Sequence, residues 1–232
     1  MLIRGTGMSI TRRVVLTVVV SCLVRLVLEK ASIAQEAPAT DGTKLPPGLY
    51  AVINTSLGSI TAELFEQLTP NTVRTFVALA LGRQPWLDPK TRKPVMRPLY
   101  ENITFHRVIP DFMIQTGDPT GTGAHNCGFT IKDEIVKSLM FDREGRLAMA
   151  NAGTKNSGGC QFFITDGPYP AGDGHYTIFG QVVNGQDVVF KIARVARDND
   201  DKPRLSIRLI NVKVTRVGAS SAPASTGIEP QR

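Results

Sequence analysis

The chain has 232 residues, of which 42% are hydrophobic, so it can form one substantial domain with a buried core and flanking segments. Its formal net charge is +7, but five basic residues and one acidic residue in the first 34 positions carry +4 of this charge. The remainder is mildly basic, has few aromatic residues and contains no basic cluster, which argues against a nucleic-acid-binding protein.

The first 34 residues have the pattern of a secretory signal peptide. Arg12 and Arg13 precede an apolar run over 14–24 that is too short to span a bilayer comfortably, and small residues follow before Gln35. We therefore expect an exported, periplasmic protein without stable membrane association after cleavage. Two alternatives stay open, an uncleaved membrane anchor and a lipoprotein attached at Cys22.

Composition divides the rest of the chain into three parts. Residues 35–47 are rich in Ala, Pro and Thr and are expected to form a flexible linker. Residues 218–232 have almost nothing to bury and are expected to form a disordered tail. The folded domain is therefore predicted to span residues 48–217.

Short strands and two helices are predicted within this domain. Two β-like runs, 49–55 and 59–65, are separated by a hairpin signal. Thr69 is expected to cap a helix that has Pro70 in its first position and apolar residues at helical spacing up to Ala80. Many short strands without a β-α-β rhythm favour a closed antiparallel barrel. The remaining elements are strands at 104–109, 112–116, 147–150, 160–165, 176–182 and 205–215, and a helix at 188–193.

A long loop at 83–99, rich in Pro, Lys and Arg, contains the only tryptophan of the chain, Trp86. This side chain is interpreted as an anchor that pins the loop to the domain. The alternative is an exposed platform for a ligand.

One stretch, FHRVIPDFMIQTGD, combines a permanent cation with large apolar side chains. Strand alternation puts Phe105, Arg107 and Ile109 on one face of a first strand. Met113 and Gln115 share one face of the strand that follows the turn. A guanidinium does not lose its charge on burial, so this arginine needs a specific role. It is part of a structural ion pair, lies at a rim, or faces a ligand over an apolar pocket.

This stretch and three further blocks resemble the cyclophilin-type peptidyl-prolyl cis-trans isomerases. The blocks are GTG at 121–123, MANAG at 149–153, and GCQFFIT followed by GDGHYTIFGQV between 159 and 183. They occur in the order typical of the family, and the resemblance covers about residues 48–216. It implies a mainly β fold, a closed eight-stranded antiparallel β-barrel capped by two α-helices.

The resemblance also implies the residues of the site and an activity on X-Pro peptide bonds. Arg107 would be the catalytic residue, which stabilises a twisted prolyl amide without a covalent step. The reaction needs no metal and no cofactor, and the partners would be proline-containing unfolded or partly folded polypeptides met by a monomer. The expected substrate-binding residues are Phe112, Met113, Gln115, Ala150, Asn151, Gln161, Phe163 and His175, the last as a wall of the pocket.

Two features leave questions open. Tyr169, Pro170 and Ala171 stand where many relatives have a tryptophan, in a region interpreted as one residue shorter, so cyclosporin binding is in doubt. Cys127 and Cys160 would remain after cleavage, either as a disulfide or as two independent thiols.

Two other functions compete with isomerase activity as interpretations of the sequence. The first is a peptide-binding module without turnover, which would have no need of Arg107. The second is a serine hydrolase that uses Ser157 and His175, but the sequence has no G-x-S-x-G elbow to support it.

Overall fold

The computed structural model describes residues 45–218. The predicted signal peptide, the linker up to residue 44 and the tail from residue 219 lie outside this range. Among the described residues, no helix combines the length and the apolar character that crossing a membrane requires.

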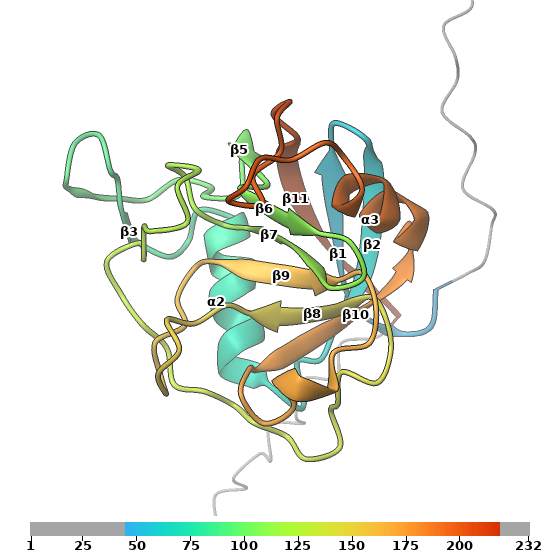
Figure 1. Cartoon of the computed structure of the whole chain (residues 1–232). Coiled ribbons are helices and arrows are strands. Elements are labelled where there is room, and N and C mark those ends of the chain that lie inside the picture. Colours follow the sequence, from blue (N-terminus) through green and yellow to red (C-terminus); the bar gives the residue numbers. More distant parts are fainter. Residues whose placement is uncertain (1–44, 219–232) are drawn as a thin grey trace, which may run out of the picture. The chain divides into compact units, whose positions relative to one another are not determined.

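The domain is built on one curled sheet in which every neighbouring pair of strands is antiparallel (Figure 1). The sheet has nine strands in the order β5-β11-β1-β2-β10-β8-β9-β7-β6. The strands are β1 (Gly48–Thr55), β2 (Gly58–Leu64), β5 (Ile103–Thr104), β6 (Arg107–Ile109), β7 (Met113–Thr116), β8 (Arg146–Met149), β9 (Phe162–Thr165), β10 (Ile178–Asn184) and β11 (Arg208–Val217).

The mainly β antiparallel architecture is confirmed, but the closed eight-stranded barrel is not correct in detail. The two edge strands, β5 and β6, are consecutive in the chain, and no ladder pairs them within the described residues. Only Phe105 and His106 separate them, so the chain itself joins the two edges of the curled sheet. The extra strand, β5, has two residues and forms by pairing with β11, and so short a strand shows no alternation in the sequence.

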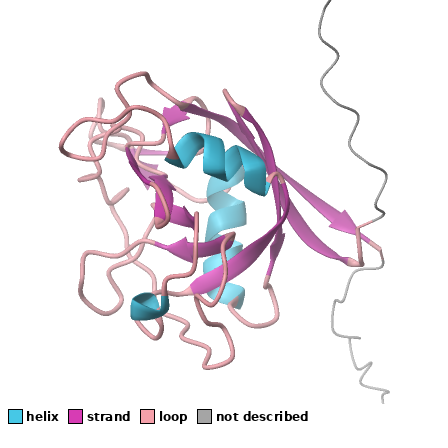
Figure 2. Ribbon diagram, turned by 45° about the vertical axis from the view of Figure 1, so that its right-hand side comes forward, coloured by secondary structure: helices cyan, strands magenta, loops and turns pink. Residues whose placement is uncertain are grey.

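Two α-helices, α2 (Pro70–Ala80) and α3 (Gln186–Ala193), pack against different parts of the sheet, as predicted (Figure 2). Helix α2 contacts β11, whereas α3 contacts β2, β6 and β7. A short 3-10 helix, η1 (Pro170–Gly172), follows β9. The buried sides of both α-helices join one core cluster, which explains why apolar spacing predicted α2.

The N-terminus of α2 is capped from a distant part of the chain. Thr69 holds the capping position, but its side chain makes no capping bond and donates to the carbonyl oxygen of Phe65 at 3.3 Å. The carboxylate of Glu134 instead accepts the N–H groups of Asn71 at 3.1 Å and Thr72 at 2.8 Å. A carboxylate also complements the partial positive charge of a helix N-terminus. The predicted N-cap position of Thr69, with Pro70 in the first helical position, is confirmed, but the capping hydrogen bonds come from Glu134 and not from Thr69.

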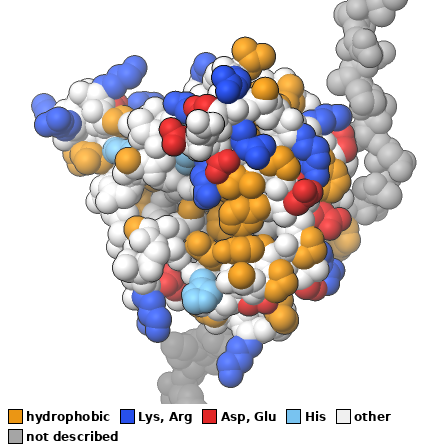
Figure 3. Space-filling model, in the orientation of Figure 1, with side chains coloured by type: hydrophobic (Ala, Val, Ile, Leu, Met, Phe, Trp, Pro, Cys, Tyr) orange, Lys and Arg blue, Asp and Glu red, His pale blue; other side chains and the backbone are white. Residues whose placement is uncertain are grey.

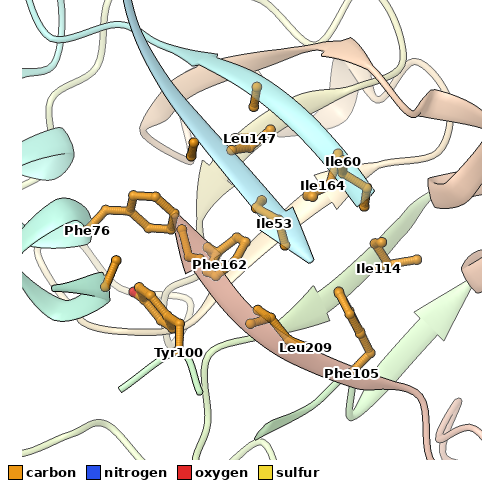
Figure 4. Close-up of a cluster of buried hydrophobic side chains, with 14 of the residues drawn as sticks. Ile53, Ile60, Phe76, Tyr100, Phe105, Ile114, Leu147, Phe162, Ile164 and Leu209 are labelled. Atoms are coloured by element: carbon orange, nitrogen blue, oxygen red, sulfur yellow. The ribbon is translucent and has the colours of Figure 1, made fainter. Parts of the chain in front are cut away.

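Alternation along the strands separates two apolar clusters. Ile114 of β7 and Phe162 and Ile164 of β9 face the interior of the curled sheet, where they pack with α2 and β1 (Figure 4). Their neighbours Met113 and Phe163 face the other side and form a second cluster. This outer cluster carries the candidate site.

The prediction for the segment before β6 is wrong at one residue. Phe105 was expected on the face of Arg107, but it is buried in the interior cluster. Strand β6 begins at Arg107, and the Phe105 N–H donates to Ile207 O at 3.0 Å, so the chain turns from one edge of the sheet to the other at this point.

The loop over 83–99 is pinned by its tryptophan, as predicted. Trp86 is 2% exposed and belongs to the interior cluster. Its indole N–H donates to the carbonyl oxygen of Arg97 at 2.8 Å. Two short strands, β3 (Trp86–Leu87) and β4 (Pro94–Val95), pair across the loop.

Candidate active site

The site begins with a row of side chains across four strands. Arg107 of β6 is paired with Gln115 of β7, Gln115 with Phe163 of β9, and Phe163 with Ala148 of β8. Directly opposed residues in an antiparallel sheet point to the same face. The cation, the amide and the aromatic ring are therefore placed side by side by strand register.

A pocket of about 460 Å³, here called the arginine pocket, opens over this row. Met113 and Phe163 are 1% and 4% exposed and form its apolar base, next to the half-buried Phe112. In Figure 3 an apolar patch lies near the middle of this face, bordered by charged side chains. The remaining lining residues include His106, Arg107, Gln115, Gly123, Ala150, Asn151, Tyr176 and Asp200.

Arg107 is held at the rim of the pocket and not within it. Its side chain is 44% exposed, and its guanidinium carbon lies 5.9 Å from the centre of the Phe112 ring. Its Nε is 3.7 Å from an oxygen of Asp201, which is a loose ion pair. The arginine is thus oriented by an aromatic face and a carboxylate while it remains accessible to a ligand.

The side-chain amides of Gln115 and Gln161 connect the row of side chains that contains Arg107 to the loop that contains Gly123 and His125. Gln115 donates to the side-chain oxygen of Gln161 at 2.9 Å. The side-chain nitrogen of Gln161 donates in turn to the carbonyl oxygens of Gly123 and His125, at 2.9 and 3.0 Å. Gln161 does not line the arginine pocket but a smaller one of about 150 Å³ beside it, which also includes Gln115 and Asn151.

A buried carboxylate organises the loop that forms the far wall. Asp118 is fully buried, and its oxygens accept the N–H groups of Thr120 at 2.6 Å, Thr122 at 3.1 Å and Gly123 at 2.7 Å. Burial raises the pKa of Asp118, but these hydrogen bonds outweigh it and leave the pKa below its usual value. These bonds hold the GTG block at 121–123 in place, where it forms one wall of the arginine pocket. No role was predicted for Asp118 from the sequence.

Asn151 lies where the three neighbouring pockets meet. Its side chain donates to the carbonyl oxygen of His175 at 2.9 Å and accepts the N–H of Gly153 at 3.0 Å. Its backbone N–H and C=O form no hydrogen bond to another residue of the described range. The preceding Ala150 is held by its N–H bond to Gln161 O at 2.9 Å, so an unpaired backbone edge faces the groove.

His175 does not lie in the arginine pocket. It is exposed and lines an adjoining pocket, whereas the next residue, Tyr176, lines both. The Tyr176 ring packs edge-on against Phe163 with 5.2 Å between ring centres. Burial raises the pKa of Tyr176. No role in the site was predicted for Tyr176 from the sequence. Its position at the start of the predicted strand at 176–182 was the one signal that could have indicated such a role.

The two cysteines form a disulfide, with 6.2 Å between the Cα atoms of Cys127 and Cys160. The bond joins the wall loop to the residue before Gln161. Of the two alternatives that the sequence left open, the structure has the disulfide and not two independent thiols.

Neither a hydrolase arrangement nor a metal cluster is present among the described residues. The Ser157 hydroxyl donates to Thr154 O at 2.6 Å and accepts the Ala152 N–H at 2.9 Å, and no histidine contacts it. No group of three His, Cys, Asp or Glu side chains within residues 45–218 is placed to hold a metal ion.

A fixed cation above an apolar cup, beside an unpaired backbone edge, defines a site suited to an extended polypeptide with one compact apolar residue. Comparison with known proteins leads to the same class. The family model described as cyclophilin type peptidyl-prolyl cis-trans isomerase/CLD matches residues 50–214. The chain belongs to this family, and it is a cyclophilin-type isomerase.

Relatives of known name agree with this assignment. Peptidyl-prolyl cis-trans isomerase-like 1 of Aspergillus fumigatus is 41% identical over 170 residues, which are 72% of this chain and 96% of that protein. Peptidyl-prolyl cis-trans isomerase A of Mycobacterium tuberculosis is 43% identical over 155 residues, 66% of this chain and 85% of that protein.

Solved structures agree on the fold. A cyclophilin-type isomerase of Cryptosporidium parvum matches with a TM-score of 0.63 and 32% identity, over 73% of this chain and 98% of that one. A second structure of that protein, in the presence of the dipeptide Ala-Pro, matches with a TM-score of 0.61 and 31% identity, over 74% and 99% of the two chains.

Proposed function

We propose that this isomerase accelerates rotation about X-Pro bonds during the folding of exported proteins, by non-covalent stabilisation of the twisted amide. The observation that carries the mechanism is the position of Arg107 above the pocket of Phe112, Met113 and Phe163. The class of enzyme is given by the family, and this geometry supports the proposed mechanism.

Prolyl bonds are the natural target of such a site because their cis and trans forms are close in energy. The barrier of ~18–20 kcal/mol arises from the partial double bond between carbon and nitrogen, which rotation disrupts. Lowering the barrier by ~7 kcal/mol would accelerate rotation roughly 10⁵-fold. A site achieves this when it binds the twisted amide more strongly than either planar form.

Arg107 is suited to that selective binding. In the twisted state the proline nitrogen regains a lone pair and accepts a hydrogen bond, which a planar amide nitrogen does not. A guanidinium is always protonated and its donors are rigidly arranged, so it can donate to this nitrogen or to the neighbouring carbonyl. Gln115, its partner across the strands, holds the same row through its bond to Gln161.

The apolar cup holds the proline ring, and the groove holds the chain on either side of it. Met113 and Phe163 form the base, and Tyr176 supplies the wall that was expected of His175. The unpaired backbone of Asn151 is available to pair with the substrate main chain as an added strand would. The Cryptosporidium parvum structure with Ala-Pro supports a proline-containing ligand.

Export to the periplasm is part of the proposal. The signal-peptide pattern of the first 34 residues supports it, and so does the disulfide, because disulfides persist in oxidising compartments and are rare in the cytosol. Mass spectrometry of the protein from a periplasmic extract would test this. A mature N-terminus near Gln35 is expected; an intact or lipidated N-terminus contradicts it.

The mechanism is tested by isomerisation rates on a proline-containing peptide with wild type, Arg107→Ala and Arg107→Lys. Removal of a donor that acts in the transition state is expected to lower kcat/KM by about 10²–10³-fold. Lysine should not restore the rate, because it lacks the planar arrangement of donors. Equal rates for wild type and Arg107→Ala would refute the role of the arginine, and an inactive wild type would favour a binding module.

A further inference from the structure

A third pocket, of about 660 Å³, continues the groove beyond the arginine pocket and shares Asn151 and Tyr176 with it. It lies between the segments 132–135 and 153–156, with Tyr169 and the 171–176 turn completing its lining. Because the two pockets share a wall, a polypeptide that places proline in the first has room to extend its neighbouring residues into the second.

The lining of this pocket carries two cations, Lys132 and Lys155, against a single acid, Asp133. His175 also lines it. Both lysines are exposed, and neither forms an ion pair within the described range. The Asp133 carboxylate already accepts the N–H of Asn156 at 2.8 Å. The name lysine pocket is used below for the site lined by Lys132 and Lys155.

The backbone that carries the two lysines is held in place. The N–H of Asp133 donates to the side chain of Asn156 at 2.9 Å, and the N–H of Asn156 donates back to Asp133. The N–H of Ile131 donates to Gly158 O at 2.8 Å. Lys132 and Lys155 each adjoin a residue of this reciprocal pair, so the backbone positions that carry the two lysines are held relative to each other.

We propose that the lysine pocket is an extension subsite that selects substrates with an acidic side chain two or three residues from the isomerised proline. The inference rests on the proposed function of the neighbouring arginine pocket. The lysine ammonium groups attract the carboxylate, while the exposed Ile135 and the Tyr169 ring offer apolar surface for the stem of the side chain. Salt screens the attraction between exposed charges, so the preference for an acidic side chain should weaken as the ionic strength rises.

The test uses nine-residue peptides with one central proline and Glu, Gln or Lys at one position, two or three residues before or after it. Isomerisation is followed by NMR exchange, which needs no coupling protease. The wild type is expected to show kcat/KM roughly three- to tenfold higher for a Glu peptide than for its Gln counterpart at low ionic strength, as for two exposed ion pairs. The ratio should approach one at about 0.5 M salt.

Charge reversal separates the subsite from the overall charge of the protein. Lys132→Glu/Lys155→Glu is expected to invert the preference, so that the Lys peptide becomes faster than the Glu peptide. The control, Lys137→Glu/Lys213→Glu, makes the same change in net charge at exposed lysines outside the pocket and should keep the wild-type ratio.

The outcomes distinguish this inference from the proposed function. A wild type that accelerates no peptide contradicts the proposed function itself. A wild type that accelerates all peptides with equal Glu and Gln rates overturns the lysine pocket alone. An equal change of ratio in the control variant would assign the preference to net charge and would also overturn it.

Discussion

The carboxylate of Asp201 holds one side of the Arg107 guanidinium, with 3.7 Å between Oδ2 and Nε. Asp201 is itself fixed, because its carbonyl oxygen accepts the Val108 N–H at 2.8 Å and its Oδ1 lies 3.2 Å from Arg197 Nε. The loop that carries Asp201 is thereby tied to the strand that carries the arginine. Arg107 lines the arginine pocket beside this contact.

We predict that Asp201→Asn lowers kcat/KM about two- to fivefold, since a partly exposed ion pair is worth up to about 1 kcal/mol. The arginine stays present but is less firmly oriented, so the loss should be far smaller than for Arg107→Ala. Rates on a neutral peptide measure it. Asp187→Asn makes the same change in an exposed ion pair with Lys191, outside the arginine pocket, and should keep the wild-type rate. A wild-type rate for Asp201→Asn would show that its contact does not orient the arginine.

Glu134→Ala is expected to lower the free energy of unfolding by about 1–2 kcal/mol, because the N-terminal N–H groups of α2 lose their acceptor. Urea denaturation measures this, and Glu101→Ala, at an exposed loop position, is the control. Burial raises the pKa of Glu134, but hydrogen bonds from Thr72 and Asn71 outweigh it and lower the pKa overall. The stabilisation should therefore be present above the usual carboxyl pKa and lost as pH falls through the lowered one. No difference between Glu134→Ala and wild type near neutral pH would argue against the cap.

His106 should make the fold sensitive to mild acid. It is 6% exposed, neither ring nitrogen has a hydrogen-bond partner in the described part of the chain, and burial lowers its pKa. The unfolded chain therefore binds a proton more readily, so stability is full above about pH 6.5 and falls as pH drops from there through the lowered pKa. Below the lowered pKa this loss is complete.

The measurement is the urea midpoint between pH 7.5 and 5. His106→Phe should show a smaller change of midpoint over this range than wild type, whatever its stability at neutral pH. His175→Asn, at an exposed position, should retain the wild-type slope. An unchanged slope in His106→Phe would assign the sensitivity to another group.

Reduction of the disulfide between Cys127 and Cys160 is expected to lower the free energy of unfolding by about 3–4 kcal/mol, since it closes a loop of 33 residues in the unfolded chain. Denaturation with and without reductant measures this. The Cys127→Ser/Cys160→Ser variant should be less stable than oxidised wild type and insensitive to reductant. A wild type whose stability is the same with and without reductant would contradict the disulfide.

Strand alternation and short motifs predicted much of the fold from the sequence. The apolar spacing of α2 and the alternation in β1 and β2 depend on neighbours within one element, so they are visible in a single chain. The motif around Arg107 identified the family for the same reason. The predicted signal peptide, monomeric state and periplasmic location stay predictions.

Contacts between distant segments were decided only by the tertiary structure. Glu134 caps a helix more than 60 residues away, Asp201 reaches Arg107 across the sheet edge, and Cys127 meets Cys160. The sequence predicted His175 as a wall of the arginine pocket, whereas the structure has the next residue, Tyr176, in that place. Neighbouring residues of an extended chain point to opposite faces, so a difference of one position decides which side chain lines the pocket. Local pattern determines which residues form an element and which of its faces is apolar. Register and loop path determine which side chains meet, because they result from packing of the whole chain.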